Sequence, residues 1–163
     1  MTIYFELIED LCSKFVDIYT VRIDGETTFE YEKYFDKEFA QHKEERDFID
    51  SSLEEIKKRG ALARYFRYEE QAGALPNRVP DEIVKLNETD QGIRLYCIRL
   101  SDNVLILLNG DIKTTQNPEY CPNVRKHFRF AKKLARFLTT YINEERIDLV
   151  NDQYCFHKRE VEL

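Results

Sequence analysis

Three side chains in the second half of this chain have the types and spacing that would bind a phosphate group. Arg94 and Tyr96 interrupt an apolar run that predicts a strand, and Lys113 follows the end of a second such run. Side chains two residues apart project from the same face of a strand. An arginine binds phosphate through two parallel hydrogen bonds, and a lysine binds it as a point charge. The pattern therefore predicts an anion site at the edge of a sheet.

Both apolar runs belong to a predicted β-hairpin within residues 92–116. Its strands are almost continuously apolar, which is typical of strands that are covered on both faces. If the turn consists of residues 102–103, then Tyr96 pairs with Asn109 and Arg94 shares their face. A three-residue loop would shift this register by one residue and would move Asn109 to the other face.

A basic helix is predicted from about residue 123 to residue 142. Its apolar residues step by four and three, and a row of bases follows the same steps one residue later. This spacing places a basic ridge beside the buried stripe. A solvated face with compensating acids opposite it in space is the plainer interpretation. The basic ridge consists of Arg125, Arg129, Lys132 and Arg136, with Lys126 and Lys133 beside it.

Charge is distributed unevenly along the 163 residues. Lys and Arg number 25 against 31 Asp and Glu, which gives a net charge of −6. Residues 1–60 hold nine bases and 16 acids, whereas residues 113–136 hold seven bases and one acid. The chain is acidic at one end and basic in one local window, so its net charge is a poor guide to its partners. A hydrophobic fraction of 42% excludes disorder over the whole chain.

Motifs of the common enzyme classes do not occur in the sequence. The five glycines are isolated, which excludes a phosphate-binding loop and a dinucleotide fingerprint. The three histidines lack the spacing of a metal site, and His127, on the basic helix, is interpreted as a partly exposed surface residue. The four cysteines form no Cys-x-x-Cys pair, so free thiols in a reducing compartment are expected. No cofactor is expected.

The composition of the chain favours a cytoplasmic protein. The first ten residues carry acids where a signal peptide carries bases. The longest apolar run, around Val104–Leu108, is far shorter than the roughly 20 residues of a membrane helix. A soluble protein of the cytoplasm is therefore the expectation.

The first 60 residues predict a helix, a hairpin and a second helix. Apolar residues at helical spacing predict a helix over residues 3–15, and β-branched residues predict a strand over 18–23. The Asp24–Gly25 dipeptide is typical of a two-residue hairpin turn, and the alternation over residues 28–35 predicts the return strand. Residues 37–60 predict a charged helix that ends at Gly60.

The remaining elements are less regular. A helical pattern resumes over residues 61–72, and residues 81–86 fit either a helical turn or a short strand. The tail from residue 143 either folds back as a short element or frays. The expected organisation is an N-terminal helix-and-hairpin extension over 1–40, a core over 41–142 and a tail over 143–163.

The hairpin and the helix after it resemble the RelE/ParE toxin superfamily, nearest its HigB-like branch. These proteins have a strand that carries an Arg and then an aromatic residue, a short turn, an apolar strand, and lysine shortly before Thr-x-x-Pro. Lys113 followed by Thr115-Gln-Asn-Pro fits that pattern, and Phe128-Arg-Phe-Ala-Lys-Lys-Leu-Ala fits the Ala-rich basic helix that follows. The resemblance covers about residues 92–135. It implies an α+β fold, with a small curved antiparallel sheet packed against helices on one side.

The resemblance also implies a function. Many members are toxins of type II toxin–antitoxin systems that cleave mRNA, often on the ribosome, without a metal, and a helix-turn-helix antitoxin silences them. Arg94 would hold the phosphate, Lys113 would stabilise charge, and Tyr96 would stack on a base. No motif of the family places His127, for which a role as general acid or base is a separate hypothesis. The ridge and Lys133 would bind RNA.

Departures from the family pattern leave alternatives open. The usual pair of lysines is reduced to Lys113, and a net charge of −6 is unusual for a protein that docks on ribosomal RNA. The alternatives are a catalytically inactive toxin-fold protein and an interaction module that binds a protein partner. The superfamily also contains members that poison gyrase and cleave no RNA, so the fold alone does not set the function.

Overall fold

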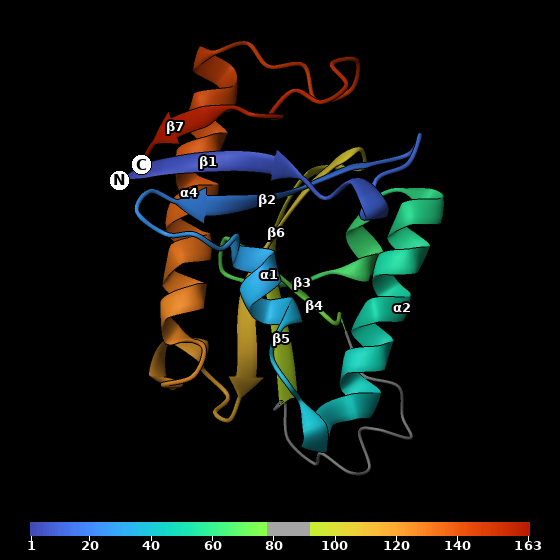
Figure 1. Ribbon diagram of the computed structural model, residues 1–163, viewed down its shortest axis with the longest axis vertical. Helices are drawn as coiled ribbons and strands as arrows, with labels where there is room; N and C mark the ends of the chain where they lie inside the picture. Colours follow the sequence, from blue (N-terminus) through green and yellow to red (C-terminus); the bar gives the residue numbers. More distant parts are fainter. Residues whose placement is uncertain (78–91) are drawn as a thin grey trace.

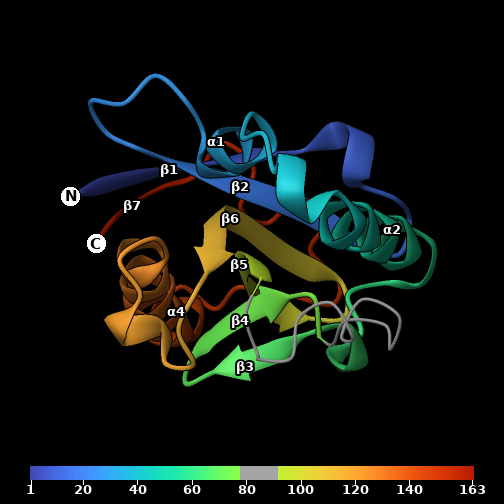
Figure 2. The same cartoon turned by 90° about the horizontal axis from the view of Figure 1, so that it is seen from below.

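The apolar hairpin forms the centre of the sheet, as its composition predicts. Strands β5 (Gly92–Ser101) and β6 (Val104–Lys113) pair antiparallel. Helix α4 (Arg125–Glu144) packs on one face of the pair and α2 (Lys43–Arg59) packs on the other (Figure 2). Because apolar side chains project from both faces of these strands, two separate clusters of buried residues form, one beneath each helix. The helices therefore lie on both sides of the sheet, not on one side as expected.

The structure is a computed structural model that describes residues 1–77 and 92–163. Its strands form one mixed sheet in the order β3-β4-β5-β6-β2-β1-β7 (Figure 1). The α+β class is as predicted, but the sheet is not wholly antiparallel, because β2 runs parallel to β6. The other strands are β1 (Thr2–Leu7), β2 (Asp17–Ile23), β3 (Arg67–Glu69), β4 (Ala72–Leu75) and β7 (Glu160–Glu162).

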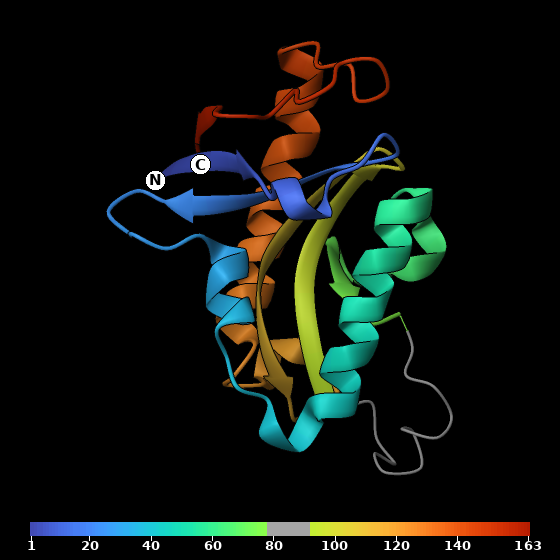
Figure 3. The same ribbon diagram turned by 45° about the vertical axis from the view of Figure 1, so that its right-hand side comes forward.

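β2 borders only half of β6. The parallel pairing runs from Asp17 opposite Val104 to Thr20 opposite Leu107 and then stops. Beyond that point β1 and β2 cross the long axis of the hairpin, and helix α1 (Glu30–Phe35) lies beside the second half of β6 (Figures 1 and 3). The main chain of that half therefore needs hydrogen-bond partners that do not come from a strand.

Two one-residue bulges adjust the hairpin. β5 contains an extra residue between Arg99 and Ser101, and β6 contains one opposite Tyr96. Because the bulges lie on opposite strands, their shifts cancel. At the far end of the hairpin, Arg94 pairs with Asp111, which is the register that a two-residue turn predicts. Only the segment between the bulges is displaced by one residue.

The predicted N-terminal helix is wrong. Residues 2–7 form β1, with Ile3 and Phe5 buried at alternate positions, and a 3₁₀ turn (Glu9–Leu11) follows. The strand predicted over 18–23 is confirmed as β2, which pairs with β1 instead of with a later strand. Gly25 adopts a φ of +87° in a turn, but that turn leads into α1 and not into the predicted return strand.

In the middle of the chain, one predicted helix is confirmed and another is wrong. The helix predicted over 37–60 is confirmed from a 3₁₀ turn (Ala40–His42) to Gly60, which has a φ of +99°. The helix predicted over 61–72 is wrong, because a 3₁₀ turn (Ala63–Tyr65) and the β3–β4 hairpin occupy that segment. The expectation for residues 81–86 lies outside the described residues.

The C-terminal tail folds back onto the sheet. A 3₁₀ turn (Pro118–Tyr120) precedes α4, and after the helix the chain returns to pair β7 with β1. Phe156 anchors this return, since its ring lies 5.1 Å from that of Phe5 and 5.8 Å from that of Tyr19, measured between centroids. The two ends of the described chain therefore lie side by side.

The four cysteines, Cys12, Cys97, Cys121 and Cys155, are free thiols, as predicted.

Candidate functional site

The register of the hairpin brings Arg94 and Lys113 to one face of the sheet. Arg94 pairs with Asp111 and Gly92 pairs with Lys113, and paired residues project from the same face. This is the face that α4 covers, because Tyr96, two residues from Arg94, lies against Phe128 of α4. The shared face of Arg94 and Tyr96, predicted from strand alternation alone, is found.

Both cations are buried. Arg94 is 1% exposed and Lys113 is 2% exposed. One guanidinium nitrogen of Arg94, Nη1, donates to the main-chain oxygen of Ile93 at 3.1 Å. Charged groups this deep in a protein are stable only when they are paired. Neither cation presents its charge to solvent in this structure.

Tyr96 belongs to the core. Its side chain is fully buried, and its ring centroid lies 6.0 Å from that of Phe128. A ring without exposed surface cannot stack on a nucleotide base, so the role expected for Tyr96 in RNA binding is not supported. Strand alternation gives the face of a residue correctly but does not tell which side chains the covering helix will reach.

His127 is buried beside this site, not partly exposed as expected. It lies in the first turn of α4 and is 7% exposed. Its position falls on the same helical stripe as Ala131 and Leu134, which face the core. Burial, reinforced by the charges of Lys37 and Lys126, lowers the pKa of His127 to about 4. The imidazole is therefore neutral at pH 7.

The Nε2 atom of His127 has no hydrogen-bond partner among the described residues. A nitrogen without a hydrogen-bond partner in a buried ring is unfavourable. A neutral imidazole nitrogen can accept a proton from a reacting group or donate one to it. His127 is therefore in the neutral form that can accept a proton, although its lowered pKa makes it a weak base and it lies in the interior.

Lys37 completes the site from a distant part of the chain. Its ammonium group donates to the main-chain oxygen of Gly110 at 2.6 Å and to Oδ1 of Asn109 at 3.0 Å, and it lies 3.4 Å from Oδ2 of Asp111. Lys37 contacts the main chain at the edge of β6 that β2 leaves open, which explains why its side chain is partly buried. Burial lowers the pKa of Lys37, and Asp111 partly offsets that effect.

The site therefore combines four kinds of group at one end of the hairpin. The guanidinium of Arg94 and the ammonium of Lys113 come from the two strands, and the neutral imidazole of His127 comes from α4. A second ammonium, that of Lys37, comes from the segment after α1, and the carboxylate of Asp111 lies among these groups. Asp111 faces Arg94 across the ladder and interacts electrostatically with both Lys37 and His127. This set can move a proton and can stabilise negative charge. Among the residues that the structure describes, no group of His, Cys, Asp and Glu could hold a metal ion.

The basic ridge lies on the opposite flank of α4 from His127. Arg125 and His127 are two residues apart, which turns their side chains about 200° from each other around the helix axis. Nζ of Lys132 lies 3.0 Å from Oε2 of Glu70, and Arg136 donates to Gln71 at 3.0 Å. Nε of Arg129 donates to Glu119 at 2.6 Å. The compensating acids that the plainer interpretation required are present for Lys132 and Arg129, whereas Arg136 has only a neutral amide as its partner within the described part of the chain and Lys133 is exposed.

The Glu70→Gln variant is expected to bind single-stranded RNA more tightly, by about threefold at low salt, because it frees the ammonium of Lys132 from an exposed ion pair. Fluorescence anisotropy with a labelled oligouridine measures this affinity. Glu144→Gln, which removes an exposed carboxylate at the other end of α4, is the matched control. Equal gains in both variants would show that only net charge matters.

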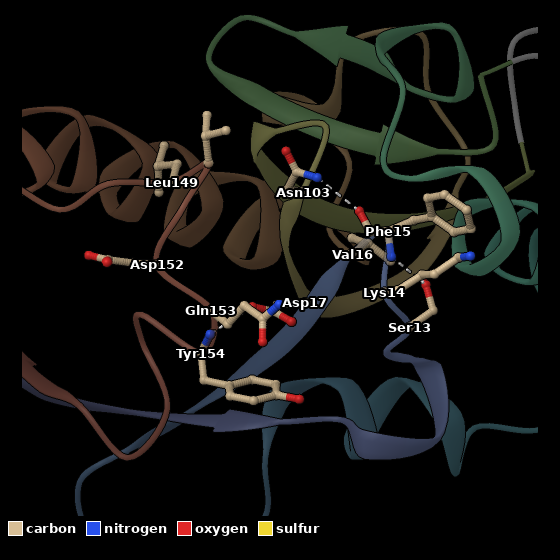
Figure 4. Close-up of a pocket in the computed structure, with 11 residues that line it drawn as sticks. Ser13, Lys14, Phe15, Val16, Asp17, Asn103, Leu149, Asp152, Gln153 and Tyr154 are labelled. Atoms are coloured by element: carbon tan, nitrogen blue, oxygen red, sulfur yellow. Dashed lines mark hydrogen bonds between the residues drawn. The ribbon is translucent and has the colours of Figure 1, made fainter.

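A separate cavity of about 300 Å³ lies where the loop between β1 and β2, the β5–β6 turn and the C-terminal segment meet (Figure 4). Its walls are held by hydrogen bonds from the main-chain N–H of Tyr154 to Asp17 at 2.8 Å and from Asn103 to the main-chain oxygen of Phe15 at 3.1 Å. None of the predicted site residues lines it, so it is not part of the candidate site.

Comparison with known proteins gives no relative for this chain. No family model, no curated protein and no solved structure matches it. Within residues 1–77 and 92–163, no helix combines the length and the apolar character that crossing a membrane requires.

Proposed function

We propose that this protein is a toxin of the RelE/ParE kind, nearest the HigB-like branch, that cleaves mRNA at the site around Arg94 and Lys113. One observation carries the proposal: the two cations share a face at one end of the hairpin, and Asp111, which pairs with Arg94 there, interacts electrostatically with the neutral, buried imidazole of His127. The resemblance of residues 92–135 supports it independently of that geometry. Its expected partners are mRNA, on or off the ribosome, and a helix-turn-helix antitoxin in the cytoplasm.

The proposed chemistry is an internal transesterification. The 2′-hydroxyl of the RNA loses its proton to Nε2 of His127 and attacks the adjacent phosphorus. The bond from phosphorus to the 5′-oxygen breaks, and the leaving oxygen takes a proton from water, which leaves a cyclic phosphate and a 5′-hydroxyl. The hydroxide that forms takes the proton from Nε2 of His127, which restores the neutral imidazole. Arg94 and Lys113 stabilise the negative charge that builds up on the phosphoryl oxygens.

The burial of the cations favours a second candidate. Arg94 and Lys113 are almost without exposed surface, and a substrate must touch the groups that act on it. A toxin-fold protein that has lost catalysis and binds a protein partner would keep the same buried charges as part of its core. Such a protein could arrest growth without cutting RNA.

Inducible expression in a bacterial host, followed by mapping of RNA ends, tests both candidates. A ribonuclease arrests growth and produces fragments that end in cyclic phosphate, and the Arg94→Ala and Lys113→Ala variants lose those fragments. Arg146→Ala, which removes an exposed cation far from the hairpin in sequence, should keep them. Growth arrest without RNA fragments supports the second candidate. The absence of both growth arrest and RNA fragments would contradict both candidates.

Removal of a buried charge could unfold the chain, so each variant needs a thermal melting curve. Arg94→Lys retains the charge but loses the two-pronged geometry, and it is expected to fold and to cleave far more slowly. Rescue of growth by an adjacent gene that encodes a helix-turn-helix protein would identify the antitoxin.

A further inference from the structure

An open groove is lined by residues of the N-terminal part of the chain, and Arg94, Lys113, His127 and Lys37 are not among its lining residues. One wall is formed by the end of β1 and the 3₁₀ turn that follows it, and the other by α1 and the residue before it. Its volume is about 340 Å³. We call it the acidic groove, and it is lined by Glu6, Leu7, Ile8, Asp10, Leu11, Thr20, Phe29, Tyr31, Glu32 and Phe35.

The floor and walls of the acidic groove are mainly apolar. Leu7, Ile8 and Leu11 are only partly buried, and Phe29 and Phe35 face them from the other wall. Phe35 is 59% exposed. Isolated exposed apolar residues are ordinary, but a continuous set on two facing walls is typical of a binding surface. Aromatic residues in particular are enriched at the centres of protein interfaces.

Every charged residue that lines the groove is an acid. Glu6 and Asp10 belong to the wall from β1 and its 3₁₀ turn, and Glu32 belongs to the wall from α1. Residues 1–60, which include every lining residue, contain nine bases and 16 acids. The groove therefore has an apolar centre between carboxylates on both sides.

The cations near the groove already have partners. Lys33 is paired with Glu26 and Glu30, Nε of Arg46 lies 3.5 Å from Asp50, and Lys57 donates to the main-chain oxygen of Asp10 at 2.8 Å. The guanidinium of Arg22 stacks on the rings of Tyr4 and Phe29 and donates to the main-chain oxygen of Glu26. The ring of His157 lies 3.8 Å from Glu6. The carboxylates of Asp10 and Glu32 are exposed.

We propose that the acidic groove docks an amphipathic segment of a partner protein, with apolar side chains on one face and Lys or Arg on both flanks. The apolar face would fill the space around Leu11 and Phe35, and the flanking cations would meet Asp10 on one side and Glu32 on the other. A small amine could pair with only one wall, whereas carboxylates on both walls match a helix with cations along both edges. The inference does not depend on ribonuclease activity.

Three designed amphipathic helices of about 18 residues test the charge requirement. All have the same leucine face, and their polar positions are lysine, glutamine or glutamate. The lysine peptide is expected to bind at least about tenfold more tightly than the other two, as measured by fluorescence anisotropy at low salt. Equal binding of the lysine and glutamine peptides would overturn the proposal, because the carboxylates would then have no part in docking.

Matched charge reversals test the location. The triple variant Glu6→Lys, Asp10→Lys, Glu32→Lys should weaken binding of the lysine peptide by more than about tenfold and should admit the glutamate peptide. The control triple variant Glu38→Lys, Glu144→Lys, Glu145→Lys makes the same change in net charge at exposed positions outside the groove, and should weaken binding by less than about threefold. Equal losses in the two triple variants would mean attraction to net charge alone and would refute the groove.

An apolar variant provides a readout that does not involve charge. Phe35→Ser is expected to weaken binding of the lysine peptide by about tenfold, because Phe35 is an exposed aromatic anchor. Tyr120→Ser, at a residue that is 73% exposed and outside the groove, should have no effect. If Phe35→Ser binds like the native chain, the peptide does not occupy the groove. If the groove triple variant melts at a lower temperature than the native chain, its weaker binding could reflect lost stability. The comparison of Phe35→Ser with Tyr120→Ser then tests whether the peptide occupies the groove.

Discussion

The Gly110→Ala variant is expected to lose about 3 kcal/mol or more of the free energy of unfolding. An ideal Cβ atom at this position would lie 1.9 Å from the main-chain oxygen of Arg94 and 2.9 Å from Cα of Leu95. Both contacts are with the main chain of the neighbouring strand, which cannot move aside as a flexible side chain could. Chemical denaturation followed by circular dichroism measures the loss.

Gly25→Ala is the matched control for Gly110→Ala. A Cβ atom at Gly25 meets nothing within 4 Å, but its φ of +87° is strained for any other residue. The expected loss is therefore only about 1 kcal/mol. Similar losses in the two variants would show that backbone freedom, and not the close approach of β5 and β6, makes Gly110 necessary.

Acidification from pH 7 to pH 4 is expected to remove about 3 kcal/mol of stability through His127 alone. Its pKa in the folded protein is about 4, below its usual value of 6.5. Between those values the unfolded chain binds a proton that the folded chain excludes, so stability falls as the pH falls. The contribution is complete above about pH 6.5 and is lost at about pH 4.

The measurement is the free energy of unfolding against pH, compared between the native chain and His127→Gln. Carboxylates also titrate in this range, but they are common to both proteins, so the difference between the two curves isolates the imidazole. Parallel curves for the native chain and His127→Gln would contradict the burial of a neutral imidazole.

Elements with a strong local pattern were predictable from the sequence. The β5–β6 hairpin, α4, and α2 with its terminal Gly60 each have enough apolar repeats, or a specific end signal, to outweigh the alternatives. The short N-terminal segments were not predictable. Ile3, Leu7 and Leu11 fit a helical period, but pairing of β1 with β2 and β7 decides the structure there. Ile3 pairs with Ile23 of β2 and with Val161 of β7, and a local hydrophobic period reports neither partner.

In the candidate site too, only the features that follow from a local sequence pattern were predictable. Alternation along one strand was sufficient to place Arg94 and Tyr96 on one face. The buried position of His127 was available from its phase with Ala131 and Leu134, although its polarity argued for the surface. The contribution of Lys37 was not available, because it depends on the edge that β2 leaves open next to Gly110. That edge follows from the crossing of distant strands.

The parallel pairing of β2 with β6 has a consequence for synthesis of the protein on the ribosome. Asp17 leaves the exit tunnel long before Val104, the residue that it must meet. The nascent β1–β2 hairpin therefore waits, with its apolar face uncovered, while the next several dozen residues are translated. Nascent chains halted before residue 104 should accordingly be sensitive to protease and dependent on chaperones, and folding should become possible only once β6 has emerged.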